Sequence, residues 1–417
     1  MHVIVLGAGL AGVTSAWYLR QAGYAVTVVD RQPAAGLETS YANGGQISAS
    51  HPEPWANPGA PAQIVRWLGR ADAPLLFRPR PDWAQWSWGL RFLRECLPAR
   101  ARRNTLAIAR LALHSRDCLH ALLAETGIEY ARLRKGILHL FFSPREFAQA
   151  ETRAALLREL GMRAEVRDAH ACLEIEPALT GNETLRGGLY APDDETGDAL
   201  AFTQALAERC HEAGVEFRFN TRITSLAAAE GRIAAVTIQE EDGSAAQIGG
   251  DAFLLALGSY SAALARPLGD RLPIYPVKGY SVTLPLADGA AAPCVSITDE
   301  SRRIVCSRLG DRLRVAGTAE LTGFDTAIDP DRCAAILRRA RQLFPRLEPA
   351  GDAAYWAGLR PATPGNVPII GRSRLPNLFY NTGHGTLGWT LACGSGQTIA
   401  AIIDGRQPDV AFPFRTR

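Results

Sequence analysis

The beginning of the chain places the strongest constraint on its fold. Residues 3–6 are a short apolar run rich in β-branched side chains, which is typical of a strand buried on both faces of a parallel sheet. Gly7, Gly9 and Gly12 follow with the spacing G-x-G-x-x-G, where a helical pattern begins. In such a turn the first glycine allows the sharp bend, the second lets a pyrophosphate approach the backbone, and the third lets the helix pack closely on the sheet. We therefore expect nucleotide phosphates at the N-terminus of this helix.

A second apolar run, residues 26–29, completes the unit and ends in Asp30. An acid about twenty residues beyond the glycines is expected to accept hydrogen bonds from a ribose. Leu10 and Ala11 inside the turn, and Arg31 beside the acid, are further candidate contacts. The pattern predicts a dinucleotide site but does not decide between NAD and FAD, and a βαβ unit without a nucleotide is the alternative.

Bulk composition narrows the class of protein. The chain has 417 residues, of which 47% are hydrophobic, and this is enough for two or three domains. Its net charge of +3 does not suggest nucleic acid as a partner. Eight cysteines without a C-x-x-C pair argue against a metal site or a disulfide framework, and they indicate reduced, mostly buried thiols in a cytoplasmic protein. The first strand follows Met1 directly and no apolar run reaches about 18 residues, so we expect neither secretion nor membrane spanning.

The loop at residues 36–55 is too long and too rich in glycine to be a simple connector. Small side chains at Ser40, Asn43 and Gly45 suit a segment that runs along an extended cofactor. An ordinary surface loop is the alternative.

Residues 55–116 differ in composition from the rest of the chain. They contain five of the eight tryptophans and eleven arginines, against three acids. Tryptophan and arginine together suit the interface of an anionic membrane. An arginine-rich outer face of a substrate domain is the alternative.

Periodicity predicts the remaining elements. Predicted helices span 104–126, 144–160, 199–213 with Asp198 as N-cap, 331–343, and a C-terminal segment ending near 404. Predicted strands span 136–142, 215–219, 222–226, 252–257, 274–285, 294–297, 304–307 and 313–316. We expect an α/β protein in which an inserted substrate domain with a mixed or antiparallel sheet interrupts a Rossmann-like nucleotide domain. The nucleotide domain would comprise 1–65, 165–273 and 345–417, and the substrate domain 66–164 and 274–344.

A second glycine-rich turn precedes the C-terminal helix. It contains Gly383, His384, Gly385, Thr386, Leu387 and Gly388. A helix N-terminus preceded by glycines is a second anion site, although such turns also start helices that touch no ligand. Ile223 and Gly258, in or after predicted strands, are additional candidates for cofactor contact.

These stretches together resemble the small-subunit family of FAD-dependent D-amino acid dehydrogenases, within the glycine oxidase and D-amino acid oxidase group. The likeness runs nearly end to end and is carried by residues 7–30, 39–48, 54–61, 194–198, 276–281, 358–364 and 383–397. It implies non-covalent FAD, oxidation of a D-amino acid to an imino acid that hydrolyses to a 2-oxo acid and ammonia, and a quinone as electron acceptor. The chain departs from the family pattern at residues 51–53 and 364–366.

The resemblance also suggests residues for the chemistry. Arg360, in Gly-Leu-Arg-Pro, is the expected clamp for the substrate carboxylate, since a guanidinium matches a carboxylate bidentately. The turn at 385–388 would stabilise an anionic reduced flavin. Tyr280 is a second candidate for the carboxylate or a packed strand residue, and Lys278 beside it is a candidate or an ordinary ion-pair partner. His384 would orient substrate or accept a proton, or be structural, and His51 is a substrate-loop candidate.

Two other functions remain open from the sequence. One is an oxidase or dehydrogenase of glycine, proline or hydroxyproline that uses oxygen. The other is a flavin-binding subunit without catalysis. The expected location is the cytoplasm, with peripheral contact at the inner face of the cytoplasmic membrane.

Overall fold

The first of two large sheets is built around the N-terminal βαβ unit. The computed structural model describes residues 1–67, 73–287 and 292–416. Six strands pair in the order β19-β20-β13-β1-β2-β9, all parallel except β19. These strands are β1 (His2–Leu6), β2 (Ala25–Val29), β9 (Glu216–Arg218), β13 (Ala252–Leu255), β19 (Ile369–Arg372) and β20 (Leu378–Thr382). Buried Val and Leu side chains fill β1 and β2, as expected for strands covered on both faces.

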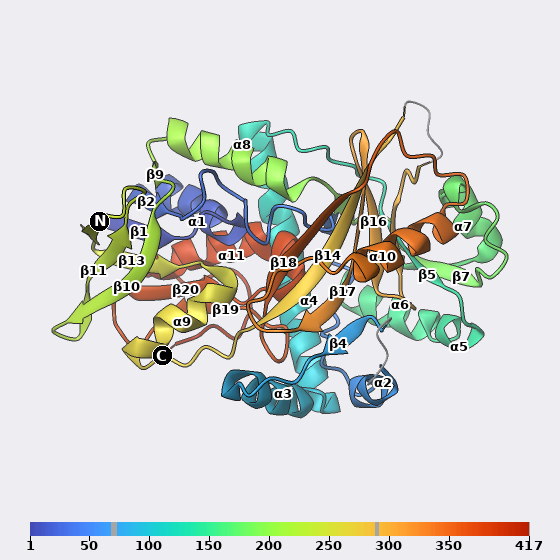
Figure 1. Ribbon diagram of the computed structural model, residues 1–417, viewed down its shortest axis with the longest axis horizontal. Helices are drawn as coiled ribbons and strands as arrows, with labels where there is room; N and C mark the ends of the chain where they lie inside the picture. The colour runs from blue at the N-terminus through green and yellow to red at the C-terminus, as the bar shows by residue number, and fades with distance from the viewer. Residues whose placement is uncertain (68–72, 288–291, 417) are drawn as a thin grey trace.

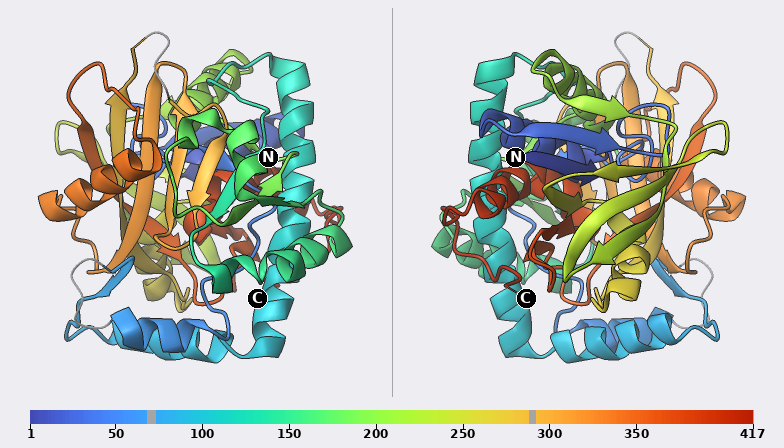
Figure 2. Two further views of the ribbon diagram at one scale, coloured as in Figure 1. Left: turned by 90° about the vertical axis from the view of Figure 1, so that its right-hand side faces the viewer. Right: turned by 90° about the vertical axis from the view of Figure 1, so that its left-hand side faces the viewer.

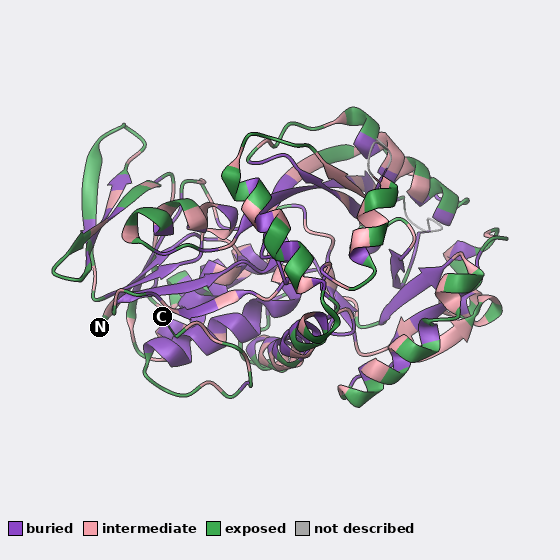
Figure 3. Ribbon diagram, turned by 90° about the horizontal axis from the view of Figure 1, so that it is seen from below, coloured by how far each residue is buried: buried purple, intermediate pink, exposed green. Residues whose placement is uncertain are grey.

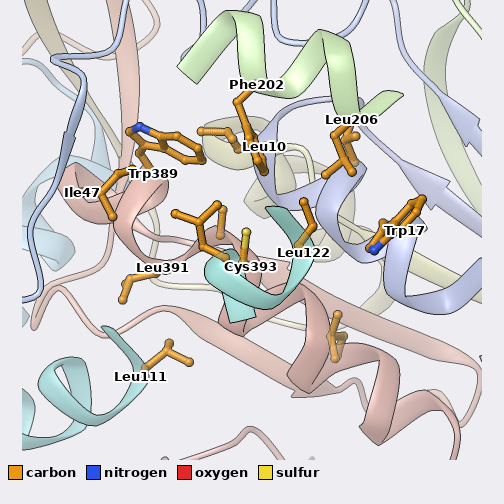
Figure 4. Packing of buried hydrophobic residues seen from close by; sticks show 14 of the residues in the cluster. Leu10, Trp17, Ile47, Leu111, Leu122, Phe202, Leu206, Trp389, Leu391 and Cys393 are labelled. Atoms are coloured by element: carbon orange, nitrogen blue, oxygen red, sulfur yellow. The ribbon is translucent and has the colours of Figure 1, made fainter. Parts of the chain in front are cut away.

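Helices α1 (Leu10–Gln21), α4 (Pro98–Thr126), α8 (Ala199–Glu212) and α11 (Gly388–Ile403) pack beside this sheet (Figure 1). Gly396 of α11 lies against α1, where a Cβ would come within 2.8 Å of the Thr14 backbone. This close approach sets the two helices side by side. Figure 4 shows the core that they share, which includes Leu10, Phe202 and Trp389.

The second large sheet is mixed and has nine strands. Its order is β18-β14-β17-β16-β15-β5-β7-β6, and β4 pairs in addition with β17. Its strands are β4 (Leu75–Phe77), β5 (Ile137–Phe141), β6 (Glu165–Asp168), β7 (Gly187–Ala191), β14 (Tyr275–Pro285), β15 (Ser296–Asp299), β16 (Ile304–Leu309), β17 (Arg312–Leu321) and β18 (Ala354–Ala362). Helix α10 (Pro330–Leu343) covers one face of β14 and β17, and its apolar residues join theirs in one core.

Smaller elements complete the chain. The strands β10 (Arg222–Ala229), β11 (Arg232–Gln239) and β12 (Ala245–Gly249) form a separate antiparallel sheet, and β3 (Gln46–Ile47) pairs with β8 (Glu195–Thr196). The other helices are α2 (Ala60–Trp67), α3 (Trp83–Glu95), α5 (Pro144–Phe147), α6 (Ala150–Glu159), α7 (Ala169–Ile175) and α9 (Ser261–Ala265). Within the described ranges, no helix combines the length and the apolar character needed to cross a bilayer.

The expected fold class is confirmed, and most elements lie near their predicted positions. Asp198 caps α8 as predicted, accepting from the backbone N–H groups of Leu200 and Ala201. The predicted helix at 144–160 is instead two helices, α5 and α6, because the chain turns at Ala148 and Gln149. The helix predicted at 104–126 begins earlier, at Pro98, which suits a first helical position. All eight cysteines are free, and six of them are buried.

The sheets divide the chain differently from the predicted segments. Strands β6 and β7 belong to the nine-stranded sheet, whereas the sequence predicts residues 165–273 to be part of the nucleotide domain. The same holds for β18, in the segment 345–417. The chain returns to the six-stranded sheet only after β7 and again after β18. A strand pattern shows that a strand exists but not which strand it pairs with, so the sheets and the predicted segments divide the chain at different residues.

Candidate nucleotide and substrate site

A cavity of about 480 Å³ lies where α1 and α11 begin. This volume is within the range of sites for small molecules and cofactors. The predicted residues that line it are Gly7, Gly9, Leu10, Ala11, Asp30, Arg31, Ser40, Asn43, Ile223, Gly258, His384, Gly385 and Gly388. Segments from both ends and the middle of the sequence therefore meet at one site.

The three glycines of the first turn have distinct surroundings. Gly7 has φ +110°, and its N–H donates to the Val29 carbonyl at 2.8 Å. A Cβ on Gly12 would come within 1.8 Å of the Gly7 carbonyl oxygen, so Gly12 closes the turn itself. A Cβ on Gly9 would meet only Ser40 Oγ, at 3.7 Å. Gly9 thus leaves open space at the start of α1, where a phosphate needs it.

Asp30 ties the second strand to the glycine turn. Its two carboxylate oxygens accept from the N–H groups of Ala8 at 2.7 Å and Gln32 at 2.9 Å. Burial raises the pKa of this carboxyl group, against the lowering effect of the two N–H donors. Each oxygen keeps a lone pair for another donor, as a ribose hydroxyl would supply.

Arg31 marks the outer end of the cavity. Its guanidinium pairs with Glu38 at 2.7 Å and lies 4.3 Å from the centre of the Tyr260 ring. Tyr260 and Glu38 also line the cavity, and sequence reasoning did not single them out. No local motif marks them, because they come from separate loops that only the fold brings together.

The second glycine turn forms the other end of the cavity. Residues Gly385–Leu387 make one 3-10 turn, and α11 follows directly without a side-chain cap. Gly388 and Trp389, the first residues of α11, line the cavity, whereas Gly383, Thr386 and Leu387 are not among its lining residues. Helix α1 also lacks a side-chain cap. Two uncapped helix N-termini therefore converge on one cavity and favour negative charge there.

His384 is the buried polar side chain of this turn. Its Nε2 lies 3.1 Å from Ser395 Oγ, and burial lowers its pKa to about 4. His384 is therefore neutral at physiological pH, and its uncharged ring can donate one hydrogen bond and accept another.

Asn43 and Gly45 lie in the loop that passes from the cavity toward the large sheet. Asn43 Oδ1 accepts from the Gly45 N–H at 2.9 Å. Gly45 has φ +80°, and a Cβ there would come within 3.1 Å of Leu309 and 3.3 Å of Ser307 of β16, but Gly45 does not line the cavity. Gly45 thus shapes the loop, while Asn43 faces the site.

Arg360 lies on β18 between Leu359 and Pro361, both of which line the cavity. Its Nη1 donates to the Thr318 carbonyl of β17 at 2.9 Å. To reach Thr318 the side chain crosses β14 at Gly279, where a Cβ would lie 2.1 Å from Nη1. Burial lowers the pKa of Arg360 to about 10, so it remains a cation at neutral pH. Among the described residues it has no acidic partner within ion-pair distance. The strand beside the cavity therefore carries a partly desolvated cation with no acidic counter-ion among the described residues.

Lys278 and Tyr280 lie on the other face of the sheet from Arg360. Arg360 lies directly opposite Val277 in the pairing of β18 with β14, so these two side chains share one face of the sheet. Side chains alternate along a strand, so Lys278 and Tyr280 lie on the other face, which α10 covers. Lys278 Nζ donates to Asp325 at 3.0 Å, and Tyr280 donates to Glu320 at 3.2 Å. Both side chains already bond to acids on this face, so we do not include them among the residues that would bind the substrate carboxylate.

His51 lies in a different polar cluster, beside His139 of β5. Possible ligand atoms of His51, His139 and Glu300 lie within 4.8 Å of one another. However, Glu300 already accepts from His139, from Arg153 at 2.7 Å and from Arg303 at 2.6 Å. Two guanidinium groups on one carboxylate oppose a divalent cation, so the cluster is an ion-pair network. His139, next to His51, lies on β5, and Arg360 lies on β18. Four strands, β14, β17, β16 and β15, separate β5 from β18 in the sheet.

The residues of the cavity fit an adenine dinucleotide that carries a ring system. Gly9 and the α1 N-terminus offer space and N–H groups for a pyrophosphate, and Asp30 offers acceptors for a ribose. The first residues of α11, His384, and Leu359 and Pro361 on either side of Arg360 also line the cavity.

Some known proteins are similar to the chain in sequence, and others are similar to it in fold. The D-amino acid dehydrogenase of Dechloromonas aromatica is 54% identical over 415 residues, covering 99% of each chain. That of Paramagnetospirillum magneticum is 52% identical over 414 residues, covering 99% of this chain and 97% of the relative. The structure of glycine oxidase from Geobacillus kaustophilus superposes with a TM-score of 0.77 at 22% identity, covering 98% of this chain and 96% of the other. L-proline dehydrogenase from P. horikoshii gives 0.75 at 17% identity, with 98% and 94% covered.

A family model described as DAO, FAD dependent oxidoreductase, matches residues 2–402. This match and the two dehydrogenase relatives confirm the resemblance that the motifs suggested, and they settle the choice of cofactor left open by the first glycine turn in favour of FAD. The chain belongs to the DAO family of FAD-dependent oxidoreductases.

Proposed function

We propose that this chain oxidises D-amino acids to imino acids, which hydrolyse to 2-oxo acids and ammonia, and passes the electrons to a membrane quinone. The observation that carries the proposal is Arg360, a cation without an acidic partner among the described residues, next to two residues that line the FAD cavity. A substrate carboxylate would supply the missing counter-ion. Names of relatives that are about half identical to the chain support the D-amino acid class.

The chain's own residues would prepare the substrate for oxidation. FAD, when bound, supplies the acceptor for the hydride that leaves Cα. Arg360 would bind the carboxylate in a site from which water is largely excluded, where a charge-assisted pair is strong. That pair would fix which face of Cα is presented to the cavity. His384, held neutral by burial, would add no positive charge beside the amine, which must lose a proton before Cα is oxidised.

The α11 N-terminus would stabilise negative charge at its end of the cavity. Its first residues are uncapped and line the site. Oriented N–H groups that are already in place act without reorganisation when charge develops. Of the predicted turn at 385–388, Gly385 and Gly388 line the cavity, so we assign this role to them.

A panel of D- and L-amino acids, assayed with an artificial dye and with oxygen, tests the proposal. We expect dye reduction with D-amino acids and little oxygen uptake. Oxygen uptake with glycine or proline and no dye-coupled turnover of D-amino acids would replace the proposal with an oxidase. A yellow protein that no amino acid bleaches would indicate a subunit without catalysis.

A further inference from the structure

Helix α3 carries an apolar stripe on its solvent side. Trp83 is 79% exposed, Trp86 47%, Leu90 64% and Leu93 50%. At 100° per residue these four positions lie within about 80° of one another on the helix surface. Leu97, which follows the helix, is 55% exposed. Large apolar side chains are thus gathered on one exposed line rather than scattered singly, which marks an interaction surface.

The opposite side of α3 is firmly attached to the protein. Trp88 Nε1 donates to the Ala362 carbonyl at 2.8 Å, and Trp88 stacks on Phe92 at 5.4 Å between ring centres. Both rings pack with Val277 and Ala362 in one core. The exposed stripe is therefore held on a rigid helix, one layer away from β18, the strand that carries Arg360.

Positive charge surrounds the stripe. Residues 83–103 contain five arginines and one acid, Glu95, which pairs with Arg100 at 2.7 Å. Arg91 and Arg94 of α3, and Arg102 and Arg103 of α4, are exposed. None of these four makes an ion pair with any residue in the described ranges. Helix α4 has no acid in its first turn and no side-chain cap, so the N-terminal end of its dipole adds to the positive field.

This surface forms the base of the molecule. Helices α2 and α3 and the start of α4 lie along the lower edge in Figure 1 and in both views of Figure 2. Seen from below, α3 faces the viewer and α4 runs back into the molecule nearly end-on (Figure 3). The base can therefore meet a flat surface without obstruction from either large sheet.

We infer that the α3 stripe, with the arginines of α3 and α4, docks the protein on an anionic lipid bilayer. Tryptophan and leucine enter the headgroup region, and the arginines pair with lipid phosphates. A second copy of the chain is a poor occupant, since a twofold interface would bring the same positive surfaces together. The inference names the surface for the proposed membrane contact, and it does not depend on which amino acid is oxidised.

Flotation of the FAD-loaded protein with lipid vesicles tests the inference. Vesicles of phosphatidylcholine alone are compared with vesicles containing phosphatidylglycerol, at about 0.01 M and about 1 M salt, where the Debye length is about 30 and 3 Å. We expect binding to the anionic vesicles at low salt only. Trp83→Gln with Leu90→Gln should lower the partition coefficient by about 10-fold or more. Arg91→Gln with Arg94→Gln should lower it roughly fivefold per arginine.

Matched variants on other faces control for the number of changes. Ile328→Gln with Tyr355→Gln removes two apolar side chains that are 46% and 45% exposed. Arg338→Gln with Arg341→Gln removes two exposed arginines from α10. Both controls should bind as the wild type does, and all variants should keep dye-coupled activity in solution.

Several results would overturn the inference. One is failure of the wild-type protein to bind anionic vesicles at low salt, and another is binding of the α3 variants that is as tight as that of the controls. A wild-type protein that is a dimer, with α3 variants that are monomers, would also overturn it. If flotation follows the expected pattern while no D-amino acid reduces the dye, the proposed function fails and the docking surface stands.

Discussion

Gly279 leaves the space that the guanidinium of Arg360 occupies. A Cβ on Gly279 would lie 2.1 Å from Nη1 and 2.2 Å from Cζ. The side chain therefore lies across β14 and reaches the Thr318 carbonyl on β17. Thr318 has φ +58° at an irregularity in the pairing of β14 with β17. Such a bulge redirects a backbone group, and here it provides the carbonyl that holds Arg360.

We predict that Gly279→Ala displaces Arg360 while the flavin stays bound. The new methyl group forces the guanidinium away from Thr318, but it lies on a strand that does not line the FAD cavity. KM for D-amino acids should rise by about 10-fold or more, since a clamp misplaced by about 1 Å loses much of its effect. Steady-state kinetics and the flavin absorbance measure the two effects. Gly351→Ala, at an exposed glycine beside Pro285, is the control and should leave KM unchanged.

Replacing Arg360 itself tests the proposed clamp directly. Arg360→Met should lower kcat/KM for D-amino acids by a factor that corresponds to about 2 to 5 kcal/mol, because a charge-assisted pair is lost and the substrate carboxylate is left unpaired. Arg360→Lys keeps the charge without the planar fork and should fall between wild type and Met. Flavin content should be normal in both. An Arg360→Met enzyme with near-normal kcat/KM would show that another residue holds the carboxylate.

Tyr280→Phe gives the matched comparison on the other face of the sheet. Because Tyr280 bonds to Glu320 on the α10 side, its hydroxyl should not touch substrate. We predict that kcat/KM changes less than about threefold, while stability falls by about 1 kcal/mol through loss of one buried hydrogen bond. A loss in kcat/KM comparable to that of Arg360→Met would show that the Tyr280 hydroxyl contacts the substrate carboxylate.

The contrast between Arg360 and Tyr280 shows which features of the site could be predicted from the sequence. The family resemblance around Arg360 made it the candidate clamp, and the first glycine turn predicted a dinucleotide at the start of α1. Which residues of β14 share a face with Arg360 depends on register, and a shift of one residue moves every side chain to the other face. Gly279 was recognisable only as a glycine inside a strand, a sign of close approach without an identified partner. The sheet to which β6, β7 and β18 belong could not be predicted for a similar reason, because the sequence of one strand does not determine which distant strand it pairs with.

The two glycines Gly9 and Gly12 should respond differently to the same substitution. Gly9→Ala places its Cβ at an ordinary 3.7 Å from Ser40 Oγ, so the fold should persist while FAD binding weakens. Gly12→Ala places its Cβ 1.8 Å from the Gly7 carbonyl, so the turn itself must move and stability should fall. Urea unfolding of the two variants and FAD titration separate these effects. Equal loss of stability in both would contradict the assignment of Gly9 to the phosphates.

His384 should make the protein sensitive to mild acid. Its folded pKa is about 4, lowered by burial from an ordinary value near 6.5. Below pH 6.5 the unfolded chain therefore binds a proton that the folded chain refuses, so stability falls as pH decreases toward 4 and this contribution levels off below that. The expected loss is about 2 kcal/mol at pH 5 and about 3 kcal/mol at full extent. His384→Gln can keep a hydrogen bond to Ser395 without titrating, so its unfolding free energy should decline less between pH 7 and 5 than that of the wild type. Urea unfolding at fixed excess FAD measures this difference, with the exposed His170→Gln as control. Parallel pH profiles for wild type and His384→Gln would mean that His384 is accessible to protons in the folded protein.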